Sequence, residues 1–279
     1  MKKTYVDVAI CYDFDGTLIK GNMQEPTFIR EKLGMTPAQF WAKADKQTIE
    51  QSADSILSYM KLMIDEARAR KLGFKREDFV ACGKEMLFFK GVTTWFERIN
   101  KYAEKKGIRL THYIISSGLE EMIEGTKIAP YFTKIYASSF MYDEYGRAVW
   151  PARIVNYTDK TQYLARINKG CLDPMDVIGV NKAMPKEQRA IPFENMIYFG
   201  DGETDVPSMS MVRSNGGYCF AVYPPNKKGA KTKASHFLTD GRVNFVVPAD
   251  YSAGKRIEKC VQSIIDKIAT DKLLESKMG

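Results

Sequence analysis

An apolar run that ends in two closely spaced aspartates constrains the fold of this chain more than any other segment. Val8 to Tyr12 are followed by Asp13, Asp15 and Gly16 in the order Asp-Phe-Asp-Gly. The run predicts a buried strand, and carboxylates this close together at its end raise each other's pKa. A chain keeps such a pair where a cation lies between the carboxylates or where one of them does chemistry. Gly16 permits a sharp turn at the strand end, where open α/β sheets bind ligands, although an ordinary Asx-rich turn could carry the same residues.

The composition is that of a globular protein with no segment dedicated to a membrane. Of the 279 residues 44% are hydrophobic and 27% are charged, and no apolar stretch is long enough to span a bilayer. The basic start Met1-Lys2-Lys3 leads into a run that Asp7 interrupts, so we expect no signal peptide. The five cysteines are odd in number and widely spaced, without a Cys-x-x-Cys pair. They predict reduced thiols in a cytoplasmic protein.

The net charge of +8 raises the question of a polyanionic partner. The lysines and arginines are dispersed, and no single face combines them with aromatic side chains that could stack on bases. We therefore expect a mostly solvated basic surface, with neither nucleic acid nor a membrane as a partner. Nothing in the sequence indicates an oligomeric state.

Helical and strand-like patterns divide the chain into two kinds of segment. From about residue 21 to residue 90, apolar residues recur at helical spacing, with a Thr36-Pro37 cap and a repeat that begins at Ile49. Three helices in a row with no strand between them predict an inserted helical module, whose third helix covers 76–89. After Gly91 strands and helices alternate, which predicts an α/β fold with a parallel, doubly wound sheet. The predicted strands of this part are 109–115, 134–137, 195–199, 217–222 and 236–238, with a hairpin over 140–150, and its helices lie near 95–102, over 159–169 and at the C-terminus.

Two further features could bind an anion. Ser116, Ser117 and Gly118 follow a predicted strand, and a hydroxyl with free backbone N–H groups at such a turn makes an anion cradle. Lys160 opens a predicted helix, where the helix dipole disfavours a cation. Ser-Ser-Gly is also common in loops, and a lysine at this position is also commonly solvated.

A second pair of aspartates completes the set of acidic residues. Asp201 and Asp205 follow an apolar run in the order Gly-Asp-Gly-Glu-Thr-Asp. In a parallel sheet they would converge with Asp13 and Asp15 on one edge. Several hard oxygen ligands suit Mg²⁺, which keeps water ligands and usually meets a substrate phosphate. The sequence therefore predicts a Mg²⁺ site built from these four carboxylates.

Taken together, the motifs resemble those of a known superfamily. Asp-Phe-Asp-Gly-Thr, a strand ending in serine, a lysine and Gly-Asp-Gly-x-x-Asp, in that order, resemble the four motifs of the haloacid dehalogenase superfamily. The resemblance spans roughly Val6 to Val222 and is greatest to phosphoserine-phosphatase-like phosphatases with a helical C1-type cap. It implies a Rossmann-like core formed by 1–20 and 91–279, with a cap domain at 21–90.

The resemblance also implies a role for each acidic residue. Asp13 would be the nucleophile that becomes an aspartyl-phosphate. Asp15 would protonate the leaving oxygen and then activate water, and its carbonyl would bind Mg²⁺. Asp201 would complete the metal site, with Asp205 beside it.

The transferred phosphoryl group would be held by the serine loop and the lysine. Ser116 is preferred to Ser117 as the phosphate ligand because it directly follows the apolar run, and Gly118 completes the loop. Lys160 is preferred to Arg153 or Lys134 as the lysine of the family pattern.

The expected function is Mg²⁺-dependent hydrolysis of a small phosphorylated metabolite. Asp15 favours phosphate chemistry, because many true dehalogenases lack an acid at this position. Asn22 stands where phosphoserine phosphatases typically carry a glutamate that holds the substrate amine, and Glu25 could replace it if the turn is helical. The alternatives are a phosphotransferase or mutase using the same aspartyl-phosphate, a non-catalytic binding protein, and a nucleic-acid end phosphatase.

Overall fold

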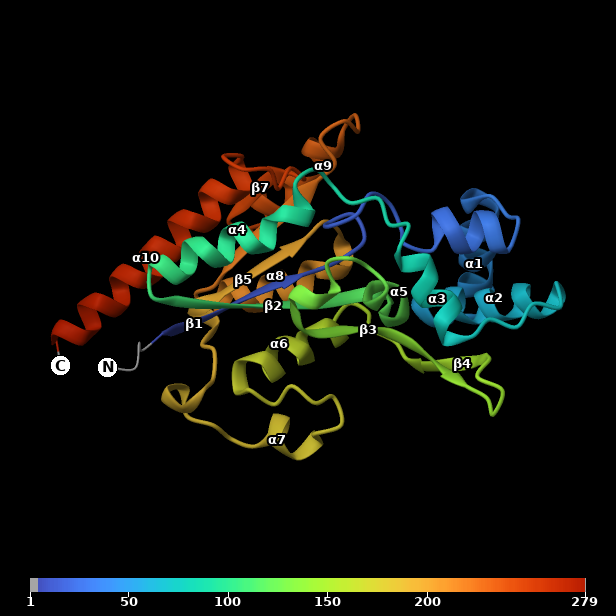
Figure 1. The fold of residues 1–279 in the computed structure, drawn as a ribbon, viewed down its shortest axis with the longest axis horizontal. Helices are drawn as coiled ribbons and strands as arrows, with labels where there is room; N and C mark the ends of the chain where they lie inside the picture. Colours follow the sequence, from blue (N-terminus) through green and yellow to red (C-terminus); the bar gives the residue numbers. More distant parts are fainter. Residues whose placement is uncertain (1–4, 279) are drawn as a thin grey trace.

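A seven-stranded sheet forms the centre of the molecule, in the order β4-β3-β2-β1-β5-β6-β7 (Figure 1). The computed structural model describes residues 5–278, so the start Met1-Lys2-Lys3, on which the signal-peptide prediction rests, lies outside it. Every neighbouring pair is parallel except β3 and β4, which form the predicted hairpin. This confirms the α/β fold class with a doubly wound sheet. The strands are β1 (Val6–Tyr12), β2 (Ile108–Leu119), β3 (Phe132–Tyr142), β4 (Ala148–Arg153), β5 (Met196–Gly200), β6 (Tyr218–Tyr223) and β7 (Phe245–Pro248).

The strand order reverses at β1, which fixes the place where a ligand can bind. The chain passes from β1 to β2 and β3 on one side, and later to β5, β6 and β7 on the other. In open α/β sheets a crevice forms outside the carboxyl ends of the strands at such a switch point. The loops that follow β1, β2 and β5 meet there, and they carry the aspartate and serine motifs.

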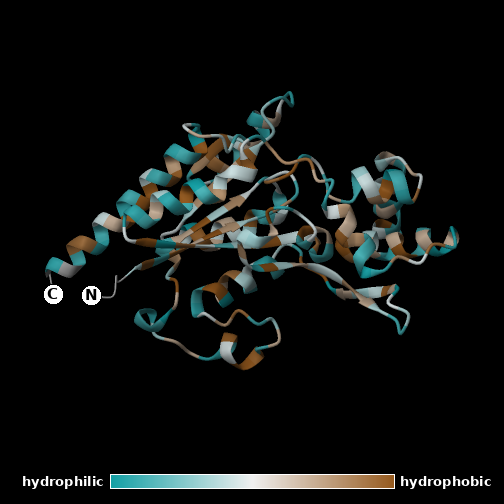
Figure 2. Ribbon diagram, in the orientation of Figure 1, coloured by the Kyte–Doolittle hydropathy of each residue, from teal (hydrophilic) through white to brown (hydrophobic). Residues whose placement is uncertain are grey.

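The alternation of side chains along β1 shows how helices cover both faces of the sheet. Val8, Ile10 and Tyr12 pack in one cluster with α4 and α10, whereas Ala9 and Cys11 pack in a second cluster with α6, α8 and α9. Figure 2 shows apolar residues on the strands and polar residues along the outer sides of the helices. The helices of this part are α4 (Val92–Lys105), α5 (Glu120–Glu124), α6 (Asp159–Lys169), α7 (Val177–Asn181), α8 (Val206–Ser214), α9 (Ala230–Thr239) and α10 (Arg256–Met278), with short turns η2 (Ala129–Tyr131), η3 (Lys186–Gln188), η4 (Phe193–Asn195) and η5 (Glu203–Asp205).

A group of helices lies beyond the carboxyl end of β1, at one end of the molecule in Figure 1. Thr36 caps the first α-helix as predicted, because its hydroxyl accepts the Gln39 N–H. The predicted repeat through Ile49 is wrong as one helix: Ser52, at φ 47°, ends α1, and the Asp54 carboxylate caps α2. Ile49 consequently faces solvent and is 79% exposed. The elements are η1 (Glu25–Lys32), α1 (Pro37–Gln51), α2 (Ser55–Ala69) and α3 (Arg76–Gly83).

The third helix of this group is shorter than predicted because the chain must return to the sheet. It ends at Gly83. Residues 87–89, which were expected to extend it, lie in the second linker between the helical group and the sheet, and they pair with residues 18–20 of the first linker. The Lys20 N–H donates to the Leu87 carbonyl at 2.9 Å, and the Phe89 N–H donates to the Leu18 carbonyl at 3.0 Å. These two linkers therefore join the helical group to the sheet as a short two-stranded connection.

The core also differs from the prediction in detail. Strands β2 and β3 are longer than the apolar runs suggested. Strand β2 continues through an irregularity after Ile115 to Leu119, which pairs with Ser138, and β3 continues through Ser139 into the hairpin with β4. His236 lies in α9 and not in a strand, because the short apolar run around it is one face of a helix that begins after Gly229. His112 is buried in β2 and bonds to Tyr12 and Asn100, as a structural residue. All five cysteines are free thiols, and no helix within residues 5–278 is long and apolar enough to cross a membrane.

Candidate active site

A cavity of about 1260 Å³ opens at the switch point of the sheet. Its walls come from the carboxyl end of β2, from the loops after β1, β5, β6 and β7, and from the two connections to the helical group. The cavity brings together most of the residues singled out in the sequence, which are distant from one another along the chain. Those that line it are Asp13, Asp15, Asn22, Glu25, Ser116, Ser117, Gly118 and Asp201.

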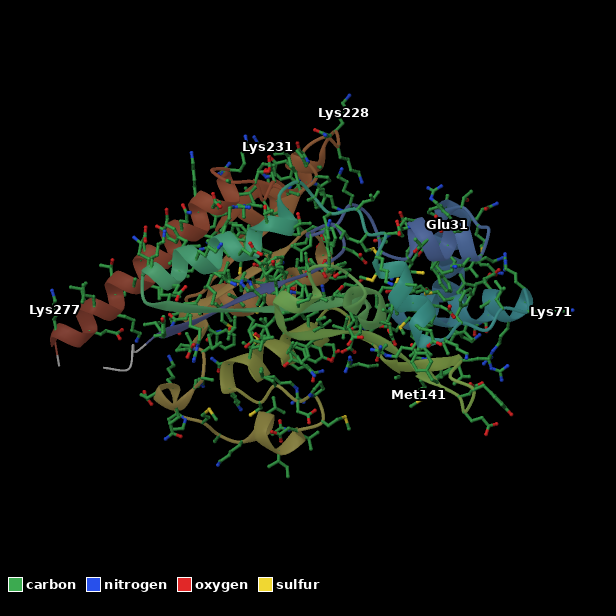
Figure 3. The ribbon with its side chains drawn as sticks, in the orientation of Figure 1. Glu31, Lys71, Met141, Lys228, Lys231 and Lys277 are labelled. Carbon is green, nitrogen blue, oxygen red and sulfur yellow. The ribbon has the colours of Figure 1, made fainter. Side chains whose placement is uncertain are left out.

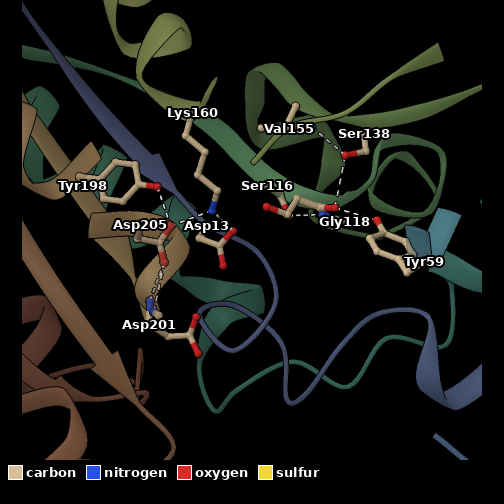
Figure 4. Close-up of polar contacts among 12 residues, drawn as sticks. Asp13, Tyr59, Ser116, Gly118, Ser138, Val155, Lys160, Tyr198, Asp201 and Asp205 are labelled. Carbon is tan, nitrogen blue, oxygen red and sulfur yellow. Dashed lines mark hydrogen bonds and ion pairs between the residues drawn. The ribbon is translucent and has the colours of Figure 1, made fainter. Parts of the chain in front are cut away.

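Asp13 forms a buried ion pair at the bottom of this site (Figure 4). The Lys160 Nζ lies 2.9 Å from Asp13 Oδ1 and 2.7 Å from Asp205 Oδ1, and the lysine is wholly buried. Burial raises the pKa of Asp13 to about 6, although the charge of Lys160 opposes this shift. Burial also disfavours the charged form of Lys160, but the two carboxylates outweigh it and raise the pKa of the lysine. The lysine at the start of α6 is therefore a fixed cation facing Asp13.

Asp205 holds this lysine and the neighbouring loop in place. Its Oδ1 accepts hydrogen bonds from Lys160 and from the Tyr198 hydroxyl, the latter at 2.8 Å. Its Oδ2 accepts the backbone N–H groups of Asp201, at 3.1 Å, and Gly202, at 3.2 Å. Both oxygens are thus engaged by groups of the chain. Asp205 therefore holds Lys160 and the Asp201 loop, and it stands beside the expected metal site as the family resemblance implied.

Asp201 lies against the backbone of the loop after β1. Gly16 has φ +70°, and a Cβ there would lie 2.1 Å from Asp201 Oδ2, so no other residue fits. Asp13, Asp201 and Asp205 each offer an oxygen within 4.8 Å of the others. Burial raises the pKa of Asp201 well above its usual range, and the charges of Asp13 and Asp205 add to this. The close approach of Asp201 therefore accounts for the glycine at position 16.

The Asp15 carboxylate points away from this group of three. Its Oδ1 accepts the Met23 N–H at 2.9 Å, which directs the side chain toward the helical group. Burial, together with the nearby charge of Asp13, raises the pKa of Asp15 well above its usual range. A carboxyl group with a raised pKa holds its proton more readily and can act as a proton donor.

The serine segment at the end of β2 forms hydrogen bonds both with the helical group and with the neighbouring strand β3. Ser116 is buried and its Oγ accepts the Gly118 N–H at 3.0 Å, so its own hydrogen is available to a ligand. The Ser117 carbonyl accepts the hydroxyl of Tyr59, from α2, at 2.7 Å and that of Ser138, from β3, at 3.3 Å (Figure 4). The helical group thus contacts the loop predicted to bind phosphate.

Asn22 and Glu25 lie together on the wall formed by the helical group. The Glu25 N–H donates to the Asn22 carbonyl at 3.1 Å, so the turn is helical, as the alternative for Glu25 required. Glu25 Oε1 accepts hydrogen bonds from Asn22 Nδ2 and from Trp41 Nε1, each at 2.9 Å. The cavity wall therefore carries a carboxylate, that of Glu25, next to the amide of Asn22, the residue that stands where phosphoserine phosphatases typically carry a glutamate.

Sequence reasoning missed three residues of the site: Tyr59, Tyr198 and Met23. Tyr198 stands three residues before Asp201 in the buried strand β5, so it resembled ordinary apolar core. Tyr59 lies in a helix more than fifty positions from the serine loop that it contacts. Nothing in the local pattern could have linked either tyrosine to the site.

Tyr198→Phe should destabilise the protein because it removes a hydrogen bond to a buried carboxylate. Such bonds contribute about 1.5–3 kcal/mol, and we expect a loss in this range from urea unfolding. Tyr163→Phe is the matched control, since Tyr163 is a buried tyrosine of α6 that makes no comparable bond to a carboxylate among residues 5–278. Equal stability of the two variants would show that Tyr198 does not hold Asp205.

Comparisons with known proteins give the context of this site. The sequence profile of haloacid dehalogenase-like hydrolases matches residues 10–210, which contain all four motifs. An uncharacterised protein of Borreliella burgdorferi is 30% identical over 282 aligned positions, covering 90% of this chain and 93% of the relative.

Solved structures share the fold at low sequence identity. A probable phosphoserine phosphatase from Vibrio cholerae is similar with a TM-score of 0.59 and 11% identity, over 97% of this chain and 69% of its own. A haloacid dehalogenase family hydrolase from Salmonella enterica serovar Typhi has a TM-score of 0.55 and 19% identity over 85% of this chain. The chain spans 66% of that hydrolase's length. At these identities the likeness concerns the fold alone.

Proposed function

The chain belongs to the haloacid dehalogenase-like hydrolase family, and we propose that it is a Mg²⁺-dependent phosphatase acting on a small phosphomonoester. The observation that carries this proposal is the buried Asp13 carboxylate at the switch point, paired with a fixed lysine. It lies beside Asp15, a second acid whose pKa is raised. This is the arrangement that nucleophilic catalysis with separate acid–base help requires.

The first step transfers the phosphoryl group to the enzyme. A carboxylate oxygen of Asp13 attacks phosphorus and the bond from phosphorus to the leaving oxygen breaks. Asp15 donates its proton to that oxygen, which departs as an alcohol. The Ser116 hydroxyl and the Lys160 ammonium would hold the phosphoryl oxygens as their charge redistributes.

The second step returns the enzyme to its starting state. Asp15, now ionised, takes a proton from a water molecule while the water oxygen bonds to phosphorus. The bond between phosphorus and the Asp13 oxygen breaks, and inorganic phosphate leaves. Asp13 is again a carboxylate and Asp15 is again protonated, so all atoms and charges balance.

The residues around Asp13 fit a Mg²⁺ ion. Asp13 and Asp201 offer carboxylate oxygens close together, while Lys160 supplies one positive charge against three carboxylates, of which Asp13 and Asp205 are buried. A divalent cation would offset the remaining negative charge. When bound, Mg²⁺ would neutralise charge on the phosphoryl oxygens. Asp13 and Asp201 would hold it, with the main-chain carbonyl of Asp15 that the family resemblance adds.

We also propose that residues 21–90 act as a cap over the site. Asn22 and Glu25 line the cavity from this segment, and the Tyr59 hydroxyl binds the Ser117 carbonyl. A segment held this way can exclude water and contact the leaving group. The candidates for substrate specificity in the cap are therefore Asn22 and Glu25.

Release of inorganic phosphate from a panel of phosphorylated metabolites tests this function. We expect Mg²⁺-dependent release from at least one small phosphomonoester. Transfer of the phosphoryl group to an added alcohol or sugar, without free phosphate, would indicate the phosphotransferase alternative. No turnover of any member, by either route, would contradict the proposed function.

Asp15→Asn should lower turnover in a way that depends on the leaving group. General acid help is worth about a hundred- to ten-thousandfold, and it matters least when the departing oxygen is a weak base. The expected loss of kcat/KM, which reports the first step, is therefore large for alkyl phosphates and much smaller for p-nitrophenyl phosphate. The same loss for both classes would remove Asp15 from the role of general acid.

A further inference from the structure

Three lysines border the outer part of the active-site cavity, and within residues 5–278 none of them forms an ion pair. Lys20 lies on the first linker to the helical group, Lys90 follows the second linker, and Lys227 lies in the loop after β6. All three line the same cavity as Asp13 and Ser116. Each lysine is exposed, and within residues 5–278 no ion pair or hydrogen bond of their ammonium groups is present.

The backbone around two of these lysines is fixed where the helical group joins the sheet. The Lys20 N–H donates to the Leu87 carbonyl at 2.9 Å. The Lys90 carbonyl accepts the Tyr251 N–H at 2.8 Å. Both positive charges therefore stay at the mouth of the cavity.

The carboxylates of the outer wall, in contrast, have donors within the chain. Glu25 Oε1 accepts hydrogen bonds from Asn22 and Trp41, as described above. Asp250 Oδ1 accepts the Ser252 N–H at 3.0 Å. Burial opposes the shift, but the bonds from Ser252 and the charges of Lys90 and Lys255 lower the pKa of Asp250. Asp250 thus offsets part of the charge of Lys90, while the ammonium groups of all three lysines are without a hydrogen-bond acceptor within residues 5–278.

The size of the cavity leaves room for a substantial leaving group. Its volume of about 1260 Å³ exceeds the roughly 300–1,000 Å³ typical of pockets for small ligands. A phosphoryl group on Asp13 would fill only the inner end. The rest of the substrate would extend past the three lysines.

We infer that the leaving group of the substrate carries a second anionic group, a carboxylate or a second phosphate, which Lys20, Lys90 and Lys227 bind. This inference rests on the proposed phosphatase function. Positive charge at the mouth of a cleft also raises the association rate of an anionic ligand. Lys228 and Lys231 extend the positive charge from Lys227 outward into solvent (Figure 3).

Three compounds that differ in a single substituent test the inference. 3-Phosphoglycerate carries a carboxylate, glycerol 3-phosphate carries a neutral hydroxymethyl group there, and phosphoserine carries the carboxylate with an adjacent ammonium. We expect kcat/KM to be roughly tenfold or more higher for 3-phosphoglycerate than for glycerol 3-phosphate, with phosphoserine below 3-phosphoglycerate. Fructose 1,6-bisphosphate compared with fructose 6-phosphate distinguishes a second phosphate from a carboxylate.

Substitution of the three lysines tests whether they cause the preference for a second anionic group. Replacing Lys20, Lys90 and Lys227 together by glutamine should reduce kcat/KM for the compound with the second anionic group roughly tenfold more than for its counterpart without that group. Lys228→Gln, which changes the same loop outside the cavity lining, is the matched control and should leave the preference intact.

The outcomes separate this inference from the function on which it rests. Equal kcat/KM for compounds with and without the second anionic group would overturn the inference and leave the proposed phosphatase standing. A preference that survives in the triple variant would also overturn it, because other residues would then bind the anion. No release from any compound would contradict the phosphatase itself.

Discussion

Asp13→Asn is expected to lower phosphatase turnover by at least about a thousandfold. An amide cannot form the bond to phosphorus that the carboxylate forms, and the Ser116 hydroxyl and the other carboxylates that line the cavity have other roles in the proposed mechanism. The protein should still fold, because asparagine has nearly the same shape and Lys160 keeps its ion pair with Asp205. Turnover with p-nitrophenyl phosphate measures the loss, and circular dichroism checks the fold.

Asp45→Asn is the matched control for this substitution. Asp45 is exposed on α1 and belongs to none of the interactions of the site, so its loss should leave turnover unchanged. If Asp13→Asn retained more than about a tenth of wild-type activity, covalent catalysis by Asp13 would be wrong.

Removal of divalent cations should abolish activity, and Mg²⁺ should restore it while Ca²⁺ supports it poorly. Without a cation, the carboxylates of Asp13 and Asp201 repel each other and the phosphate that must approach them. Ca²⁺ takes longer bonds and more ligands, which would misplace the phosphate relative to Asp13. Turnover in EDTA followed by titration with each ion measures this effect.

A binding measurement separates the metal site from its role in turnover. An ion that binds only the folded protein raises its stability, by about 2.7 kcal/mol at a concentration one hundred times Kd. Mg²⁺ should therefore raise the Tm of the wild type and of Glu203→Gln, an exposed neighbour, but not that of Asp201→Asn. Full activity in thoroughly chelated buffer, with no change of Tm on adding Mg²⁺, would refute the site.

The sheet and the place of the site could be predicted because their signals are local in the sequence. A buried strand followed directly by polar residues occurs at Asp13, at Ser116 and at Asp201, and parallel strands bring these ends to one edge. The order of the motifs then indicated the family. The lysine of α6 was identified in the same way, although its complete burial between two carboxylates was not.

The remaining features depend on contacts between distant segments. Asp205 was expected beside the metal site, but its hydrogen bonds with Tyr198, Lys160 and backbone N–H groups could not be foreseen. The end of α3 was placed too late because its length depends on pairing with residues 18–20. Apolar spacing alone cannot reveal a partner that lies sixty positions away in the chain.

The central claim is that the phosphoryl group passes through a covalent bond to Asp13. Acid quenching during turnover of p-nitrophenyl phosphate by Asp15→Asn, in which the second step should be slowed, traps any such intermediate. Borohydride reduction followed by peptide mass analysis then locates it. We expect the peptide that contains Asp13 to carry the phosphoryl group, and position 13 to become homoserine on reduction. A phosphoryl group on another residue, or none while aryl phosphate is being turned over, would contradict the proposed mechanism.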